Sequence, residues 1–220
     1  MRLQQFKNRT EAGQVLAAQL GAYANRPDVV VLALPRGGVP VAFEVAQALN
    51  APLDVFLVRK LGTPGQPELA MGAIASGGIR VLNPSVVEWL GIPGEMIDQI
   101  ASDEQRELER RERAYRDDRP PVEVRDRTII LVDDGLATGS TMRAAIAALK
   151  QQHPARLIAA APVAPLSTCA ALREDVDDVI CPLAIAAFDG VSRWYQDFSQ
   201  TSDAEVRALL EAAHCKAATT

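Results

Sequence analysis

The stretch from Thr128 to Thr141 constrains the fold of this chain most strongly. It begins with the apolar and β-branched run Thr128–Val132, which is followed by two adjacent carboxylates, Asp133 and Asp134. A short, unbroken apolar run is typical of a strand buried on both faces, as in a parallel sheet. Small and hydroxyl-bearing residues come next and lead into apolar residues at helical spacing. The stretch therefore predicts a buried strand, a polar turn and the start of a helix.

Apolar runs elsewhere extend this prediction to a whole sheet. Residues 28–34 and 53–58 have the composition of core strands, and residues 39–49 between them have helical spacing. A strand, a helix and a strand in this order form a βαβ unit with parallel strands. Further core strands are expected within 156–165 and at 178–181. We predict an α/β fold, an open parallel sheet flanked by helices on both faces.

The remaining segments are interpreted as additions to one domain that covers residues 1–220. Gly and Pro residues predict a loop at 61–69, and a Gly-Gly pair predicts the turn of a hairpin at 70–82. A helical insertion is expected at 83–127. It includes a projecting, charged helix at 94–118, whose thin apolar line consists of Ile97, Ala101, Leu108 and Tyr115. Ser167 is expected to cap a helix that runs to Arg173, and residues 187–220 to form a small hood and a C-terminal helix that starts at a capping box, Ser202–Glu205.

The polar turn has the chemistry of a phosphate site. Unpaired N–H groups and the helix dipole favour an anion at a helix start, and glycine lets the backbone approach closely. The two carboxylates repel a phosphate, but they suit ribose hydroxyls or a Mg²⁺ ion. No lysine stands where a Walker P-loop requires one, and the GxGxxG dinucleotide pattern is absent. A ribose-phosphate ligand therefore fits better than a nucleoside triphosphate or a dinucleotide.

Residues 129–141 match every position of a known signature: four apolar residues, two acids, Gly, a variable residue, a small residue, Thr, Gly, a variable residue and Thr. The stretch resembles the signature with which type I phosphoribosyltransferases bind 5-phosphoribosyl 1-pyrophosphate (PRPP). The resemblance implies that Asp133 and Asp134 are catalytic and hold Mg²⁺. It also implies that the 5′-phosphate is bound by Gly135, Ala137, Thr138, Gly139, Ser140 and Thr141.

Two other segments are expected beside this signature, because ligands bind at the carboxyl ends of parallel strands. The segment Arg36, Gly37 and Gly38 follows the first strand and offers N–H groups and a guanidinium. The resemblance implies that it binds pyrophosphate and that the Arg36–Gly37 peptide is cis or strained.

Arg59 and Lys60 are expected to close the second core strand, where we assign them as catalytic cations. The loop at 61–69 would then close over PRPP. Within that loop, Glu68 is either a metal or base contact or a solvated carboxylate.

Aromatic residues gather near the C-terminus of a chain in which only 5% of residues are aromatic. Phe188, Trp194 and Tyr195, with Phe198 nearby, are interpreted in two ways. They close the edge of the core, or they form a stacking wall for a planar acceptor. The resemblance implies a hood that binds the acceptor, and we assign Phe188, Trp194 and Tyr195 to it as predicted acceptor contacts.

The composition limits the functional classes. The formal net charge of −5 argues against a nucleic-acid surface, and no apolar stretch is long enough for a membrane span. Three cysteines without CxxC spacing and only two histidines argue against a zinc site. Unpatterned cysteines suit a reducing compartment, so we expect a cytoplasmic protein.

The resemblance implies an enzyme of nucleotide metabolism, usually a homodimer. It would use PRPP and Mg²⁺ to transfer a phosphoribosyl group to a nitrogenous, nucleobase-like acceptor and release pyrophosphate. The alternative is a non-catalytic protein that binds PRPP or a nucleotide and acts as a regulator. A regulator that also binds nucleic acid would need a basic face, and the glutamates between the arginines of residues 104–116 cancel such a charge. The sequence leaves the identity of the acceptor open.

Overall fold

The structure, a computed structural model, describes residues 5–116 and 119–217, apart from the side chains of residues 67, 68, 216 and 217. Its centre is a five-stranded parallel sheet in the order β2-β1-β6-β7-β9. The strands are β1 (Val29–Ala33), β2 (Leu53–Val55), β6 (Thr128–Val132), β7 (Arg156–Ala160) and β9 (Asp178–Ile180). All residues of β1 and β6 are buried. The predicted parallel sheet, with the signature strand at its centre, is confirmed.

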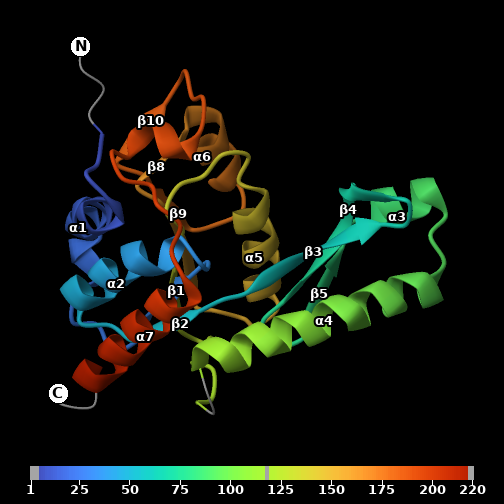
Figure 1. The fold of residues 1–220 in the computed structure, drawn as a ribbon, viewed down its shortest axis with the longest axis horizontal. Helices are drawn as coiled ribbons and strands as arrows, with labels where there is room; N and C mark the ends of the chain where they lie inside the picture. Colours follow the sequence, from blue (N-terminus) through green and yellow to red (C-terminus); the bar gives the residue numbers. More distant parts are fainter. Residues whose placement is uncertain (1–4, 117–118, 218–220) are drawn as a thin grey trace.

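Helices cover both faces of this sheet, as predicted (Figure 1). Helices α1 (Arg9–Gln19), α2 (Gly38–Leu49) and α7 (Asp203–Ala217) cover one face, and α5 (Ser140–Lys150) and α6 (Leu166–Leu172) cover the other. Alternate strand residues divide between the two sides. Val31 and Ile130 belong to the core under α1, α2 and α7, whereas Leu32 and Leu131 belong to the core under α5 and α6.

An arm of antiparallel strands and two helices extends to one side of the parallel sheet (Figure 1). It contains β3 (Val58–Thr63), β4 (Gln66–Ala75), β5 (Ile79–Leu82), α3 (Pro84–Leu90) and α4 (Gly94–Arg116). The predicted turn at Gly77 and Gly78 is confirmed, with φ values of 83° and 73°. So is the start of α3, where the Val86 N–H donates to the Asn83 side chain. The apolar line of α4 is buried, as expected for one contact face.

Two predictions about this region are wrong. Residues 53–58 do not form one strand, because β2 ends at Val55 and a new strand starts at Val58. Residues 61–69 are not a loop either. Most of them belong to β3 and β4, which pair with register shifts next to Gly62, and the turn shrinks to Pro64 and Gly65. The Gly and Pro residues of this segment predicted a loop. Pairing with β4 supplies the backbone hydrogen bonds that make residues 61–63 part of a strand instead.

A hood lies beyond the carboxyl ends of β7 and β9 (Figure 1). It is formed by the short parallel strands β8 (Val163–Pro165) and β10 (Leu183–Ile185) and by a 3₁₀ turn, η2 (Val191–Trp194). Helix α6 begins at Leu166 and its N-cap is Pro165, so the predicted capping role of Ser167 is wrong. The capping contact of α7 is confirmed by the Glu205 N–H, which donates to Ser202 Oγ at 3.1 Å.

Among the helices of residues 5–116 and 119–217, none combines the length and the apolar composition that crossing a membrane would require.

A buried ion pair ties the arm to the parallel sheet. Arg116 Nε, at the end of α4, lies 2.8 Å and 3.0 Å from the two carboxylate oxygens of Asp54 in β2. The same guanidinium donates to the Val55 carbonyl at 2.6 Å, and Asp54 also accepts from the Val122 N–H at 3.1 Å. Both side chains are less than one tenth exposed. Asp54 and Arg116 therefore fix where α4 ends against the sheet.

Replacing Asp54 by alanine should destabilise the fold by about 3–5 kcal/mol, since it leaves the Arg116 guanidinium buried without its main counter-ion. Urea denaturation followed by circular dichroism measures this. The control is Asp189→Ala, which removes an ion pair with Arg193 whose side chains are 66% and 72% exposed. It should cost less than about 1 kcal/mol. Equal effects of the two substitutions would contradict the role of the buried pair.

Candidate active site

The signature loop connects β6 to α5 and is held from both sides. The Leu136 N–H donates to the Val163 carbonyl at 2.9 Å, and Thr168 Oγ1 donates to the Ala137 carbonyl at 2.8 Å. Gly139 has a φ of +72° and is the N-cap of α5. A Cβ atom at Gly139 would lie 2.8 Å from Thr168 Cγ2, so glycine is required there for both conformation and space. The hood and α6 therefore fix the shape of the loop.

The far side of the loop is open and suits an anion. Thr138 and Ser140 carry hydroxyl groups at this turn, and Thr138 Oγ1 lies 2.8 Å from Ser140 Oγ. The first N–H groups of α5 have no carbonyl partner within the helix, and the Ser140 N–H has only a long contact of 3.4 Å to Thr138 Oγ1, so these groups can serve a ligand. Arg143 adds a nearby positive charge, because its Nη2 donates to the Thr138 carbonyl at 2.7 Å. Gly135 is buried, like Gly139, and a Cβ there would lie 2.4 Å from Val191 Cγ1 in the hood.

The two carboxylates of the signature have different surroundings. Asp133 Oδ1 accepts a hydrogen bond from the Asp134 N–H at 2.9 Å. Asp134 Oδ2 lies 2.8 Å from both Nε and Nη2 of Arg9, at the start of α1. The Tyr195 hydroxyl donates to the Asp134 carbonyl at 2.6 Å. Asp134 is thus held by two groups that are remote from it in sequence.

Burial also shifts the acidities of these groups. It raises the pKa of the Asp133 carboxyl well above its ordinary value, and the nearby charge of Asp134 adds to the rise. Burial raises the pKa of Asp134 as well, whereas the charge and hydrogen bond of Arg9 lower it. Enclosure likewise raises the pKa of the Tyr195 hydroxyl, so it stays a hydrogen-bond donor. A cationic ligand or a hydroxyl donor would therefore be favoured next to Asp133.

The loop after β1 packs directly on these carboxylates. A Cβ at Gly37 would lie 2.0 Å from Asp134 Oδ2, and a Cβ at Gly38 would lie 2.8 Å from the Val132 carbonyl. The structure thus brings Arg36, Gly37 and Gly38 beside the signature, as expected at the carboxyl end of a sheet. The cis peptide of this loop joins Pro35 and Arg36, not Arg36 and Gly37 as predicted.

Arg59 and Lys60 do not close a core strand, since both lie within β3. The Arg59 guanidinium is hydrogen-bonded to Glu104 of α4 and lies 4.0 Å from Glu107. Lys60 is exposed and points to the opposite face of the strand, because successive strand residues alternate. The catalytic roles of both residues stay predictions. The side chain of Glu68 lies outside the part of the chain that the structure describes.

Residues from the loop with Arg36 and from the strand with Arg59 line one small pocket. It has a volume of about 50 Å³ and is lined by Arg36, Arg59, Thr141, Arg111 and Tyr115, among others. Arg111 and Tyr115 come from α4 and were not predicted as site residues; the sequence had placed Tyr115 on the apolar line of this helix. Each arginine has a carboxylate neighbour: Arg36 lies 3.7 Å from Asp203, and Arg111 Nε lies 2.8 Å from Glu107. Part of the positive charge around the pocket is therefore balanced without a ligand, although Glu107 is shared with Arg110.

The aromatic cluster is largely part of the core. Trp194 and Tyr195 are 6% and 4% exposed and pack with Phe6 and Val163. Phe188 is partly buried, and its ring stacks on Trp194 with centroids 6.5 Å apart. This burial favours the interpretation in which the aromatic residues close the edge of the core. Acceptor binding by these three residues stays a prediction.

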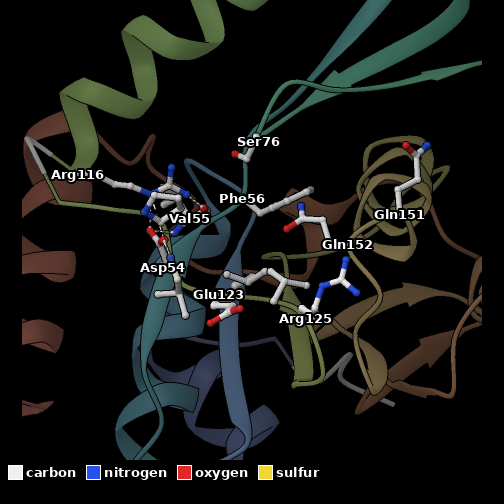
Figure 2. Close-up of a pocket in the computed structure, with 14 residues that line it drawn as sticks. Asp54, Val55, Phe56, Ser76, Arg116, Glu123, Arg125, Gln151 and Gln152 are labelled. Atoms are coloured by element: carbon white, nitrogen blue, oxygen red, sulfur yellow. Dashed lines mark hydrogen bonds and ion pairs between the residues drawn. The ribbon is translucent and has the colours of Figure 1, made fainter.

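A second cavity, of about 430 Å³, lies apart from the signature loop (Figure 2). Arg116 and Asp54 form one wall and Gln151 and Gln152, just after the C-terminal end of α5, form another (Figure 2). The signature loop is at the opposite end of this helix, roughly 16 Å away at 1.5 Å per residue. No predicted site residue lines this cavity. The candidate active site is therefore the one at the carboxyl ends of β1 and β6.

Comparison with known proteins agrees with this geometry. A family model described as a phosphoribosyl transferase domain matches residues 2–196. The chain belongs to the phosphoribosyl transferase family. The match includes both glycine-containing loops and the signature strand.

Relatives of this phosphoribosyl transferase domain include a protein of Mycobacterium tuberculosis (strain H37Rv) named "Putative phosphoribosyl transferase Rv0571c". It is 44% identical over 209 residues, which are 95% of this chain and 47% of the relative. The same values hold for a protein of strain CDC 1551 that carries the same functional name. The chain thus spans about half the length of these curated relatives.

Solved structures resemble this phosphoribosyl transferase domain over almost its full length. The protein TT1426 from Thermus thermophilus superposes with a TM-score of 0.84 and 38% identity, covering 94% of this chain and 97% of the other. A hypothetical protein from Neisseria gonorrhoeae with bound ppGpp has a TM-score of 0.51 at 12% identity, with the same coverages. The second likeness shows the fold alone.

Replacing Gly37 by alanine should destabilise the domain by about 1–3 kcal/mol, because the new methyl group would overlap the Asp134 carboxylate. The control is Gly21→Ala, where no atom lies within 4 Å of the added Cβ. That change should be neutral or slightly stabilising. Thermal unfolding by calorimetry measures both. A Gly37→Ala variant as stable as the control would contradict the close packing of the two loops.

Proposed function

We propose that this phosphoribosyl transferase domain transfers the 5-phosphoribosyl group of PRPP to a nitrogenous, nucleobase-like acceptor and releases pyrophosphate. The observation that carries the proposal is the geometry of the signature. The turn at the start of α5, residues 137–141, lies next to the enclosed carboxylate of Asp133. One ligand with a phosphate at one end and ribose hydroxyls at the other matches both features.

In this proposal the turn anchors the 5′-phosphate and thereby positions the C1 carbon of the ribose. Thr138, Ser140 and Thr141 supply hydroxyl groups, and the first N–H groups of α5 supply further donors. Binding a remote group in this way contributes to catalysis because it fixes the reacting atoms in place. Asp133 accepts hydrogen bonds from the ribose hydroxyls, which keeps them oriented.

The reaction breaks the bond between C1 and the pyrophosphate oxygen and forms a bond from C1 to the acceptor nitrogen. The leaving pyrophosphate keeps the bonding electron pair, and the acceptor nitrogen loses a proton to solvent or a base. Positive charge develops on the ribose and negative charge on the leaving group. In the proposed reaction, Arg36 and Arg59, which line the small pocket with Thr141, stabilise the pyrophosphate.

A Mg²⁺ ion fits the residues present, because Asp133 supplies the hard oxygen donor that this ion prefers. In residues 5–116 and 119–217 no three His, Cys, Asp or Glu side chains are grouped as a metal site. Most ligands of the ion would then be water and substrate oxygens, as is common for Mg²⁺ at phosphate sites. When bound, it would offset the negative charge of the pyrophosphate.

Non-catalytic binding of PRPP or a nucleotide is the second candidate. The observation in its favour is the pairing of Arg36, Arg59 and Arg111 with carboxylates, which reduces the positive charge that could assist a leaving pyrophosphate.

Assembly as a homodimer and a cytoplasmic location also stay predictions. Light scattering coupled to gel filtration would test the first of these.

Release of pyrophosphate should be measured with PRPP, Mg²⁺ and a panel of purine and pyrimidine bases. The proposal predicts that one panel member starts steady release. PRPP binding without release for any acceptor would favour the non-catalytic candidate. No PRPP binding at all would contradict both.

In the active combination, Asp133→Asn should lower kcat/KM by at least about 100-fold, because the amide cannot stabilise the positive charge near C1. The control is Asp175→Asn, which alters an exposed side chain near Lys150, outside the site. It should leave the rate unchanged. A near-normal rate for Asp133→Asn would remove this residue from the proposed mechanism.

A further inference from the structure

We infer that α4 supplies a further contact for the pyrophosphate group, the guanidinium of Arg111, and that Glu107 of the same helix competes with the ligand for it. This inference rests on the proposed function and deepens it. Arg36 comes from the loop after β1 and Arg59 from β3, whereas Arg111 lies on the long helix of the arm. The inference therefore adds a third element of the fold to the pyrophosphate end of the site.

One face of α4 carries the groups that reach this end of the site. Glu107, Arg111 and Tyr115 follow one another at intervals of four residues, so they lie one above the other on the helix. Arg111 and Tyr115 line the pocket of about 50 Å³, and Arg36 and Arg59 line it as well. The helix thus presents a guanidinium to the same space as the two other arginines.

Tyr115 fixes this face of α4 against the rest of the site. It is 3% exposed, and its hydroxyl donates to Asp203 Oδ1, in the first turn of α7, at 2.7 Å. The same carboxylate oxygen lies 3.7 Å from Arg36 Nη1. Enclosure and the hydrogen bond to Asp203 raise the pKa of Tyr115 to about 12, so the hydroxyl keeps its proton and goes on donating. The last turn of α4, one turn beyond Arg111, is therefore held beside the loop that carries Arg36.

Glu107 is the carboxylate on which the arginines of this face converge. Its Oε1 lies 2.8 Å from Arg111 Nε and 4.0 Å from Arg59 Nη1, and its Oε2 accepts from Arg110 Nε at 2.7 Å. The hydrogen bonds from Arg110 and Arg111 lower the pKa of Glu107 to about 2, so it is fully charged at neutral pH. Arg59 is also hydrogen-bonded to Glu104. Glu107 is thus the shared partner of Arg110 and Arg111 and balances one of their two charges.

Pyrophosphate can take the place of Glu107 at Arg111. The contact with Glu107 uses Nε, and the terminal nitrogens of Arg111 have no hydrogen-bond partner recorded within residues 5–116 and 119–217. The Arg111 side chain is 47% exposed, so it can turn toward a ligand in the pocket. A guanidinium binds phosphoryl oxygens through parallel N–H groups, and such charged contacts are stronger than neutral hydrogen bonds. Pyrophosphate also carries more negative charge than one carboxylate, which favours the exchange.

The test is isothermal titration of three ligands, each with Mg²⁺, into the full chain and its variants. The ligands are inorganic pyrophosphate, PRPP and ribose 5-phosphate. Arg111→Gln should weaken the binding of pyrophosphate and of PRPP at least about tenfold, because it removes a charge-assisted contact. Ribose 5-phosphate has no pyrophosphate group, so its affinity should stay within about threefold of wild type.

The matched control is Arg110→Gln. Arg110 also pairs with Glu107, but its side chain is 65% exposed and it is not among the residues that line the pocket. Each variant removes one positive charge and one partner of Glu107, so the two should unfold at similar temperatures. Arg110→Gln should bind pyrophosphate within about threefold of wild type, because solvent and salt screen an exposed charge outside the pocket.

Glu107→Gln should have the opposite effect. The amide keeps the size of the side chain but not its charge, so Arg59 and Arg111 lose a competing anion. Pyrophosphate should bind about three- to tenfold more tightly than it does to wild type. The double variant Glu107→Gln/Arg111→Gln should lose most of this gain, because the guanidinium that Glu107 released is no longer present.

Three results would overturn the inference alone. They are normal pyrophosphate binding by Arg111→Gln, an equal loss of affinity in Arg110→Gln, and unchanged or weaker binding by Glu107→Gln. The second would reduce the role of Arg111 to a general effect of charge. A wild-type protein that binds neither PRPP nor pyrophosphate would overturn the proposed function, and the inference with it. Binding of pyrophosphate through Arg111 without binding of PRPP would overturn the proposed function and leave Arg111 as an anion contact.

Discussion

The close approach of two loops at the carboxyl end of the parallel sheet is the constraint on which the rest of the site depends. Gly37 and Gly38 lie so near to Asp134 and to the end of β6 that a methyl group at either position would collide with them. The parallel pairing of β1 with β6, which aligns Ala33 with Val132, sets this distance. The two loops therefore form one site. In the proposed function, residues 137–141 bind the 5′-phosphate and the loop with Arg36 binds the pyrophosphate of the same ligand.

Ion pairs are the second feature that shapes the site and its surroundings. Arg9, Arg36 and Arg59 each lie beside a carboxylate, and Arg116 is buried against Asp54. The pairs join the sheet to α1, α4 and α7. A ligand at the site must compete with these carboxylates or bring a cation with it, as PRPP with Mg²⁺ would in the proposed function. Of these pairs, Arg59–Glu104 and Arg116–Asp54 involve α4, and the second fixes the end of this helix against the parallel sheet.

The sequence predicted the features that depend on local pattern. The buried signature strand, the βαβ unit, the hairpin at Gly77 and the buried line of α4 follow from short-range periodicity and turn residues. It did not predict the contact between Arg9 and Asp134, because no local signal links residues 125 positions apart. It placed Arg59 at the end of a core strand since the pairing of β3 with β4 is non-local. Aromatic content alone also could not distinguish a buried Trp194 from a stacking surface.

The assignment of the phosphoribosyl site is tested most directly by titrating the wild-type protein with PRPP, with and without Mg²⁺. The same titration is then made with a variant in which the turn at residues 137–141 is blocked. We expect one PRPP per chain, tighter binding with Mg²⁺, and loss of binding when Gly139, which has a φ of +72°, is replaced by valine. A folded wild-type protein that binds no PRPP, or a Gly139→Val variant that is folded and binds normally, would contradict the assignment of this turn as the phosphoribosyl site.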